Sequence, residues 1–158
     1  MEEPYYYLGN DYKKDKRSWC CIGCNKYLTE AICCIESMFG DLPKNNTPIW
    51  YGDHPKVDNS IHMNDEEHHI YQMIIGILNW LVCLGRIDIW FTVSSLSHLS
   101  GFPRYGHLDQ VLRVFGYLKK NNDWWVVVDS SYPILVVCVY TLEKDHIDWI
   151  KWGDKLMK

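Results

Sequence analysis

The sequence has no excess of positive charge. Its 158 residues include 16 Lys and Arg against 20 Asp and Glu, which gives a formal net charge of -4. A free-standing nucleic-acid-binding domain usually carries a positive surface. Any contact between this chain and nucleic acid is therefore expected to be local.

The sequence also has little that would suit a membrane. The stretch from Met73 to Gly85 carries no charge but has only 13 residues, whereas a transmembrane helix needs about 20. We therefore expect a buried helix at this position and no membrane partner.

A secretory signal and a disulfide framework are missing as well. No apolar run follows the acidic start Met1–Pro4, although a signal peptide would require one. The 7 cysteines are odd in number and irregularly spaced, unlike those of a small secreted domain. An intracellular compartment that keeps thiols reduced is therefore expected.

No established catalytic motif is present. The sequence contains no Gly-rich phosphate loop, no Gly-x-Ser-x-Gly, no His-Glu-x-x-His and no Walker pattern. His68 and His69 follow three acidic residues, which favours a solvated first helical turn over an acid–base or metal cluster. From its motifs alone, the chain shows no active site.

Two short patterns leave metal chemistry open. Cys21 and Cys24 have the spacing of half a zinc site, but a structural site needs four ligands, so ordinary thiols are the alternative. Asp129 ends an apolar strand-like run, as metal ligands of two-metal nucleases do, and a turn Asp is the alternative.

Short β-strands are predicted near both ends of the chain. Aromatic-rich residues 5–12 and residues 18–22 are expected to pair around a charged turn at 13–17. Residues 124–128 and 134–141 have the apolar composition of two further strands.

Helices are predicted between these strands, because apolar residues recur there at three- and four-residue steps. They span 26–39, 66–84, 89–99 and 106–120. A connector with three prolines, 41–63, follows the first helix, and a last helix is expected over 143–158. The predicted fold class is α+β, with a mostly helical middle.

Three details of these helices are expected. Asn64 and Glu67 have the spacing of a capping box for the second helix, which is apolar almost all round and should be buried on most sides. Asp88 should cap the third helix. The fourth helix should bury one face, made of Leu108, Val111, Leu112, Phe115 and Leu118.

Residues 71–119 also carry a series of motifs that resemble a known family. They are Tyr71-Gln72, Ile75-Gly76, Gly85-Arg86-x-Asp88-Ile89, Val93-Ser94, Leu96-Ser97, Pro103, His107-Leu108 and Arg113-Val114 with Tyr117-Leu118-Lys119. In this order and spacing they resemble the downstream end of the reverse transcriptase in copia-type retrotransposon Pol polyproteins. Upstream, Tyr6-Tyr7-Leu8-Gly9 resembles a strand that follows the family's catalytic motif, and Lys26-Tyr27-Leu28 resembles the start of its first thumb helix.

The resemblance implies a division of the chain into four segments. Residues 1–40 would be the end-of-palm hairpin and first thumb helix, and 41–65 a connector. Residues 66–120 would be the helical thumb and connection segment, and 121–158 a partial strand and tail region. Ile87 departs from the family, which usually has proline between the arginine and the aspartate.

The implied activity is RNA-directed DNA synthesis, but this chain is expected to be inactive alone. The family holds two magnesium ions with paired aspartates in a Tyr-x-Asp-Asp turn, and these 158 residues contain no such turn. We therefore expect no cofactor in this chain. The expected partners are the palm and fingers of a complete polymerase and an RNA–DNA or DNA template–primer duplex.

The resemblance places four residues for contacts with the duplex backbone: Tyr7, Gly9, Lys26 and Tyr27. The cationic residues Arg86, Arg113, Lys119 and Lys120 are expected to make further phosphate contacts or, alternatively, intramolecular ion pairs. Two other functions stay open at this point. One is a small interaction module of retrotransposon origin, and the other is a metal-dependent nuclease remnant built on Asp129.

Overall fold

A computed structural model describes residues 6–14, 20–50, 58–128 and 137–141. The chain divides into two compact units. One unit, here called the sheet unit, consists of Met1–Tyr27 and Asp123–Lys158, and the other, the helical unit, is Leu28–Asn122. The expected helix over 143–158 lies outside the described residues, as do the charged turn beyond Lys14 and residues 134–136.

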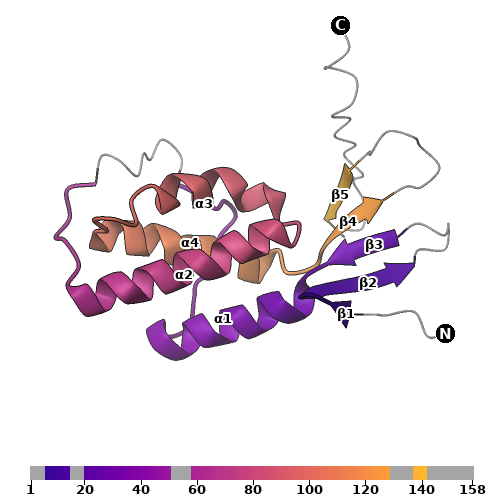
Figure 1. The fold of residues 1–158 in the computed structure, drawn as a ribbon, viewed down its shortest axis with the longest axis horizontal. Coiled ribbons are helices and arrows are strands. Elements are labelled where there is room, and N and C mark those ends of the chain that lie inside the picture. Colours follow the sequence, from indigo (N-terminus) through magenta and orange to yellow (C-terminus); the bar gives the residue numbers. More distant parts are fainter. Residues whose placement is uncertain (1–5, 15–19, 51–57, 129–136, 142–158) are drawn as a thin grey trace, which may run out of the picture. The chain divides into compact units, whose positions relative to one another are not determined.

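The sheet unit contains a five-stranded antiparallel sheet whose strands follow the order of the chain (Figure 1). The strands are β1 (Tyr6–Tyr7), β2 (Asn10–Lys14), β3 (Cys20–Gly23), β4 (Trp124–Val128) and β5 (Val137–Thr141). Together with the helices described below, they confirm the α+β fold class. The sheet joins the first and last of the four expected segments, because β3 pairs with β4.

The predicted continuous strand over 5–12 is wrong. The chain reverses at Leu8 and Gly9, whose φ angles are 51° and 91°, and Tyr7 pairs directly with Asn10 across this two-residue turn. Glycine adopts a positive φ without steric cost, and such turns match the twist of the flanking strands. Residues 6–14 are therefore a hairpin, with β2 continuing to Lys14.

Gly23 allows β3 to pair closely with β4. Gly23 lies opposite Trp125, and a Cβ at this glycine would lie 2.8 Å from the Trp125 ring. The ring therefore covers the glycine backbone. The sequence predicted β4 but not this pairing, since about a hundred residues of chain separate the two strands.

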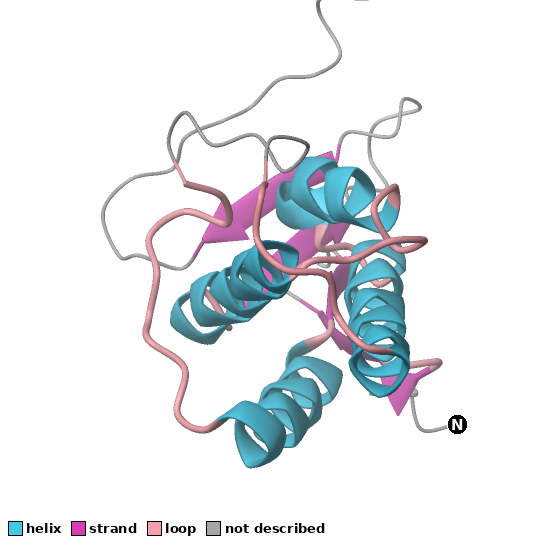
Figure 2. Cartoon of the chain, turned by 90° about the vertical axis from the view of Figure 1, so that its left-hand side faces the viewer, coloured by secondary structure: helices cyan, strands magenta, loops and turns pink. Residues whose placement is uncertain are grey.

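The helical unit is built around α2, α3 and α4, which contact one another (Figure 2). Its elements are the greater part of α1 (Asn25–Phe39), followed by α2 (Asp65–Cys83), the short 3-10 helix η2 (Ile87–Ile89), α3 (Trp90–Ser97) and α4 (Tyr105–Lys120). The fully buried apolar side chains of this unit include Leu28, Ile35, Tyr71, Ile74, Leu78, Leu81, Ile89, Leu96, Val114, Phe115 and Leu118.

The helix ends follow local chemistry that the sequence predicted. The capping box is confirmed: the Asn64 side chain accepts a hydrogen bond from the Glu67 backbone, and the Glu67 carboxylate accepts one from the Asn64 N–H. Gly40 and Gly85, which follow α1 and α2, have φ angles of 85° and 110°. Such conformations end helices readily at glycine.

Three expectations about the helices are wrong. The helix α2 is not buried on most sides, because Ile70, Met73 and Trp80 are exposed. Asp88 does not cap α3, since the residue before that helix is Ile89, which makes no side-chain cap. The carboxylate of Asp88 binds Arg86 instead.

The third error concerns the buried face of α4. Leu108 and Leu112 are only partly buried, whereas His107, Val114 and Gly116 are buried alongside the expected Val111, Phe115 and Leu118. Gly116 is buried because the connector after α1 packs closely on it, with the Pro43 carbonyl in the space that a Cβ would occupy.

Among the helices of the described residues, none is long and apolar enough to cross a membrane.

Candidate nucleic-acid interface

The eight residues proposed for duplex contact fall into two groups. Tyr7, Gly9, Lys26 and Tyr27 belong to the sheet unit, and Arg86, Arg113, Lys119 and Lys120 belong to the helical unit. Each group is described by itself below.

Three residues of the first group lie together at the β1–β2 hairpin. The Tyr7 side chain is 60% exposed on β1, and Gly9 forms the turn that follows it. The backbone N–H of Lys26 donates a hydrogen bond to the Asp11 carboxylate at 3.0 Å. Its ammonium group lies 4.7 Å from the centroid of the Tyr6 ring, within the range of a cation–π contact.

Tyr6 and Asp11 are direct cross-strand partners, so both Lys26 contacts converge on one pair of residues. We call Tyr6, Tyr7, Gly9, Asp11 and Lys26 the hairpin cluster. The Lys26 ammonium therefore lies against the same hairpin that carries the exposed Tyr7 ring and the Gly9 turn. Tyr27, the fourth residue of the group, is partly buried, and burial raises the pKa of its hydroxyl.

A second cation–π contact in the sheet unit was not anticipated from the sequence. The Lys13 ammonium lies 3.6 Å from the Trp125 ring centroid. The two residues share a face because Lys13 opposes Cys21 and Trp125 opposes Gly23, two positions further along β3. Only the strand register brings them together, so no local pattern could have identified the pair.

Arg86 makes intramolecular contacts and is completely buried. Its Nε and Nη2 donate to the two carboxylate oxygens of Asp88 at 3.0 and 2.8 Å, and its Nη1 donates to the Asn121 carbonyl at 2.7 Å. This bidentate geometry is the strong form of the arginine–carboxylate pair. The guanidinium has no exposed surface for a phosphate, so the structure supports the intramolecular alternative for this residue.

Lys119 also binds within the helical unit. Its ammonium lies 2.6 Å from both the Glu36 and the Asp41 carboxylates and 3.2 Å from the Leu42 carbonyl. Hydrogen bonds to Asp41 and Glu36 raise the pKa of Lys119, although partial burial opposes the shift. The hydrogen bond from Lys119 correspondingly lowers the pKa of Asp41. Two acidic groups therefore neutralise this cation.

Arg113 and Lys120 differ from the other two, because the described side chains that they contact are neutral. Arg113 donates to the side-chain oxygens of Asn45 and Thr47, and Lys120 donates to the Asn46 amide oxygen. Within the described residues neither forms an ion pair with an acidic side chain. These two cations remain available to an anionic ligand.

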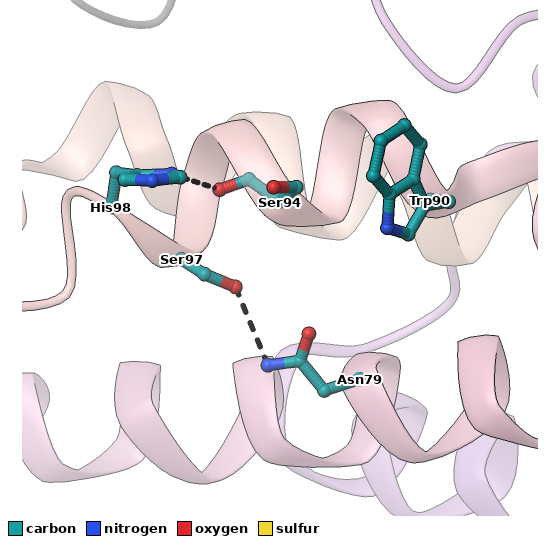
Figure 3. Close-up of a pocket in the computed structure, with 5 residues that line it drawn as sticks. All are labelled: Asn79, Trp90, Ser94, Ser97 and His98. Atoms are coloured by element: carbon teal, nitrogen blue, oxygen red, sulfur yellow. Dashed lines mark hydrogen bonds between the residues drawn. The ribbon is translucent and has the colours of Figure 1, made fainter.

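A groove of about 310 Å³ lies between α2 and α3 (Figure 3). Its lining consists of Asn79, Trp90, Ser94, Ser97 and His98. The His98 ring nitrogen bonds the Ser94 carbonyl, and the Ser97 hydroxyl donates to the Val93 carbonyl. No hydroxyl of the groove is bonded to this imidazole, so the arrangement lacks the pairing of nucleophile and base that hydrolases use.

No metal centre forms within the described part of the chain. Cys21 and Cys24 are buried and form no disulfide with a described residue, and no group of three or more His, Cys, Asp or Glu side chains there is placed to hold a metal ion. The His68 ring bonds the Ser100 carbonyl. Asp129 lies outside the described residues, so the nuclease interpretation stays a prediction, which loss of metal-dependent cleavage in Asp129→Asn would support.

No family model matches the sequence, and comparisons with curated proteins and with solved structures found no match either.

Proposed function

We propose that this chain is a duplex-contacting part of a copia-type reverse transcriptase, which holds a template–primer helix without catalysing nucleotide addition. The proposal rests on the motifs that extend in order from Tyr6 to Lys119. It also covers an intracellular setting, which the odd number and irregular spacing of the 7 cysteines favour.

The observation that carries the proposal is the hairpin cluster. The resemblance selects Tyr7, Gly9 and Lys26 from positions up to 19 residues apart, and the Lys26 contacts with Asp11 and Tyr6 bring them to one hairpin. An ammonium group, an exposed tyrosine and a turn backbone are the groups that proteins use for contacts with phosphates and sugars.

Such contacts position a duplex and carry little sequence information. They suit a chain whose formal net charge is -4, because a local contact between the Lys26 ammonium and one phosphate does not need a positive surface over the whole chain. Affinity should be modest and should depend strongly on salt, since each neutralised phosphate releases counterions.

Lys26→Gln tests the cluster directly. The variant removes the ammonium but keeps the backbone N–H that binds Asp11. We expect weaker binding to an RNA–DNA hybrid and a salt slope lower by about one. Lys14→Gln is the matched control, because Lys14 is exposed at the other end of β2. Equal affinities of the two variants would remove the hairpin cluster from the proposed interface.

Primer extension tests the catalytic part of the proposal. With magnesium, an RNA template and an annealed DNA primer, we expect no nucleotide incorporation, because the sequence has no Tyr-x-Asp-Asp pair to hold the metal ions. Template-dependent extension by the purified chain would contradict this expectation.

The second candidate function is an interaction module, and an exposed apolar stripe on α2 favours it. Ile70, Met73 and Trp80 are 38%, 44% and 45% exposed and recur at helical spacing with no charged residue between them. Contiguous exposed apolar surface of this kind is typical of a face that packs on another protein or domain. In the proposed polymerase, that partner would be the palm or fingers.

A further inference from the structure

The connector after α1 lies directly against α4. The Asn45 N–H donates to the Gly116 carbonyl at 3.1 Å, and the Asn45 side-chain amide donates to the Arg113 carbonyl at 3.3 Å. A Cβ on Gly116 would collide with Pro43 and Asn45. This close approach fixes residues 43–50, here called the strap, along one face of the helix.

Arg113 and Lys120 lie on that same face of α4, because seven residues correspond to about two helical turns. Arg113 donates to Asn45 at 3.4 Å and to Thr47 at 3.0 Å, whereas Lys120 bonds Asn46. Three consecutive strap residues are thus each held by a cation of the helix.

Trp50, at the end of the described strap, stacks with Arg113. The guanidinium carbon lies 3.7 Å from the ring centroid, and the Trp50 side chain is still 55% exposed. The hydrogen bonds to Asn45 and Thr47 hold the guanidinium and so fix the position of the ring. One face of the indole is therefore covered by a cation, and much of its remaining surface is open to solvent.

The charges around Arg113 and Lys120 differ from those around Lys119. Lys119 is matched by Glu36 and Asp41, but the partners of Arg113 and Lys120 are neutral amides, a hydroxyl and an indole. The Nε of Arg113 is buried and has no hydrogen-bond acceptor among the residues that the structure describes. A cationic group held without an acidic partner attracts an anion more strongly than a paired one.

We propose that the strap and α4 form a binding site for single-stranded nucleic acid. An unpaired base stacks on the open surface of Trp50, and the adjoining phosphates lie near Arg113 and Lys120. Exposed aromatic rings combined with cations and amide side chains are the usual components of sites that bind single strands without sequence preference. The strap amides can contact sugars and base edges.

The site belongs wholly to the helical unit and does not depend on the hairpin cluster. It adds a ligand class to the proposed function, because an unpaired strand presents its base faces and a duplex does not. The contacts that support the site are those that Trp50, Thr47 and Asn46 make with α4. Of the residues at this site, only Arg113 and Lys120 were expected from the sequence to contact nucleic acid.

Fluorescence anisotropy with a labelled oligothymidylate tests the proposal. Trp50→Ala should weaken binding by about tenfold, within the range that loss of one stacked base causes, and Trp50→Phe should restore most of it. Trp90→Ala is the matched control, because Trp90 is 61% exposed on α3 but has no cation–π partner among the described residues. It should bind as the wild type does.

Lys120→Gln should lower affinity and reduce the salt slope by about 0.7, the value for one phosphate of a single strand. An oligomer with abasic sites should bind wild type and Trp50→Ala equally, because it has no base to stack. Thermal unfolding of each variant, recorded in parallel, separates lost binding from lost folding.

The proposal is overturned if Trp50→Ala binds oligothymidylate as tightly as Trp90→Ala while remaining folded. It is also overturned if the substitution weakens binding of the abasic oligomer equally, since stacking would then play no part. Neither outcome affects the duplex test, because Lys26→Gln and Lys14→Gln change residues of the sheet unit alone.

Discussion

At the scale of single residues, Arg86 is the most consequential buried group. It links the end of α2 to Asp88 and to the Asn121 carbonyl after α4. Burial, together with the nearby Asp88, raises the pKa of Tyr117 to about 12. The motif Gly85-Arg86-x-Asp88 was one of the motifs that carried the family resemblance. Its observed role is to join helices rather than to contact a ligand.

We expect Arg86→Met to lower the free energy of unfolding by about 3–5 kcal/mol, because the Asp88 carboxylate would lose its partner while remaining mostly buried. Ile87→Ala is the neighbouring control, since Ile87 is 53% exposed, and it should change stability by less than about 0.5 kcal/mol. Urea unfolding measures both. A loss below about 1 kcal/mol for Arg86→Met would contradict the structural role.

Asp58 gives the helical unit a dependence on acid pH. Burial alone would raise the pKa of this carboxyl, but hydrogen bonds from the Ser60 backbone and hydroxyl, together with His107 and Arg104, lower it below its usual value. Both Ser60 bonds measure 2.8 Å. The lowered pKa means that Asp58 stabilises the fold above about pH 4 and loses this effect as the pH falls through the folded-state pKa.

Asp58→Asn should therefore reduce stability by about 1–3 kcal/mol near neutral pH. The difference from the wild type should shrink on acidification, because the wild-type carboxyl then becomes neutral as well. Urea unfolding of both proteins across a pH series measures this. A constant difference down to acid pH would show that the Asp58 charge does not matter.

At the scale of elements, two helical glycines differ in the space around them, because the strap packs against only one of them. Gly116 meets Pro43 and Asn45 at the position of a Cβ, whereas Gly76 in the middle of α2 has no atom within 4 Å. Alanine favours a helix over glycine by about 1 kcal/mol in both cases. Packing therefore decides the sign of the effect at Gly116.

Gly116→Ala should destabilise the protein by about 1–3 kcal/mol, because the strap has to move off the helix. Gly76→Ala should leave stability unchanged or raise it by up to about 1 kcal/mol. Thermal unfolding of the two variants gives the comparison. If Gly116→Ala were as stable as Gly76→Ala, the strap would not lie against α4 as described.

The elements also show which structural features local sequence patterns can predict and which they cannot. Helical periodicity predicted α1, α2 and α4 to within about two residues, which is the usual uncertainty of helix ends, and the capping box at Asn64 predicted the start of α2. The turn at Leu8 and Gly9 was missed, because tyrosines on both sides favoured one uninterrupted strand. Contacts between distant segments, such as Trp50 with Arg113 and Gly23 with Trp125, leave no local pattern.

At the scale of the whole molecule, the exposed stripe on α2 should govern association. Met73→Lys places a charge in the middle of Ile70, Met73 and Trp80 and should reduce self-association at high protein concentration. It should change the free energy of unfolding by less than about 0.5 kcal/mol, because Met73 is already 44% exposed. Sedimentation velocity over a concentration series measures the effect. A wild-type chain that stays monomeric throughout would contradict the expectation that this stripe drives self-association.

The most direct test of the central claim is an equilibrium titration of the wild-type chain against a labelled RNA–DNA hybrid over a series of salt concentrations. The proposed duplex contact predicts saturable binding at low salt, with a logarithmic affinity that falls linearly as salt rises. A flat signal at low salt, with the protein folded, would contradict the claim that this chain holds a template–primer duplex.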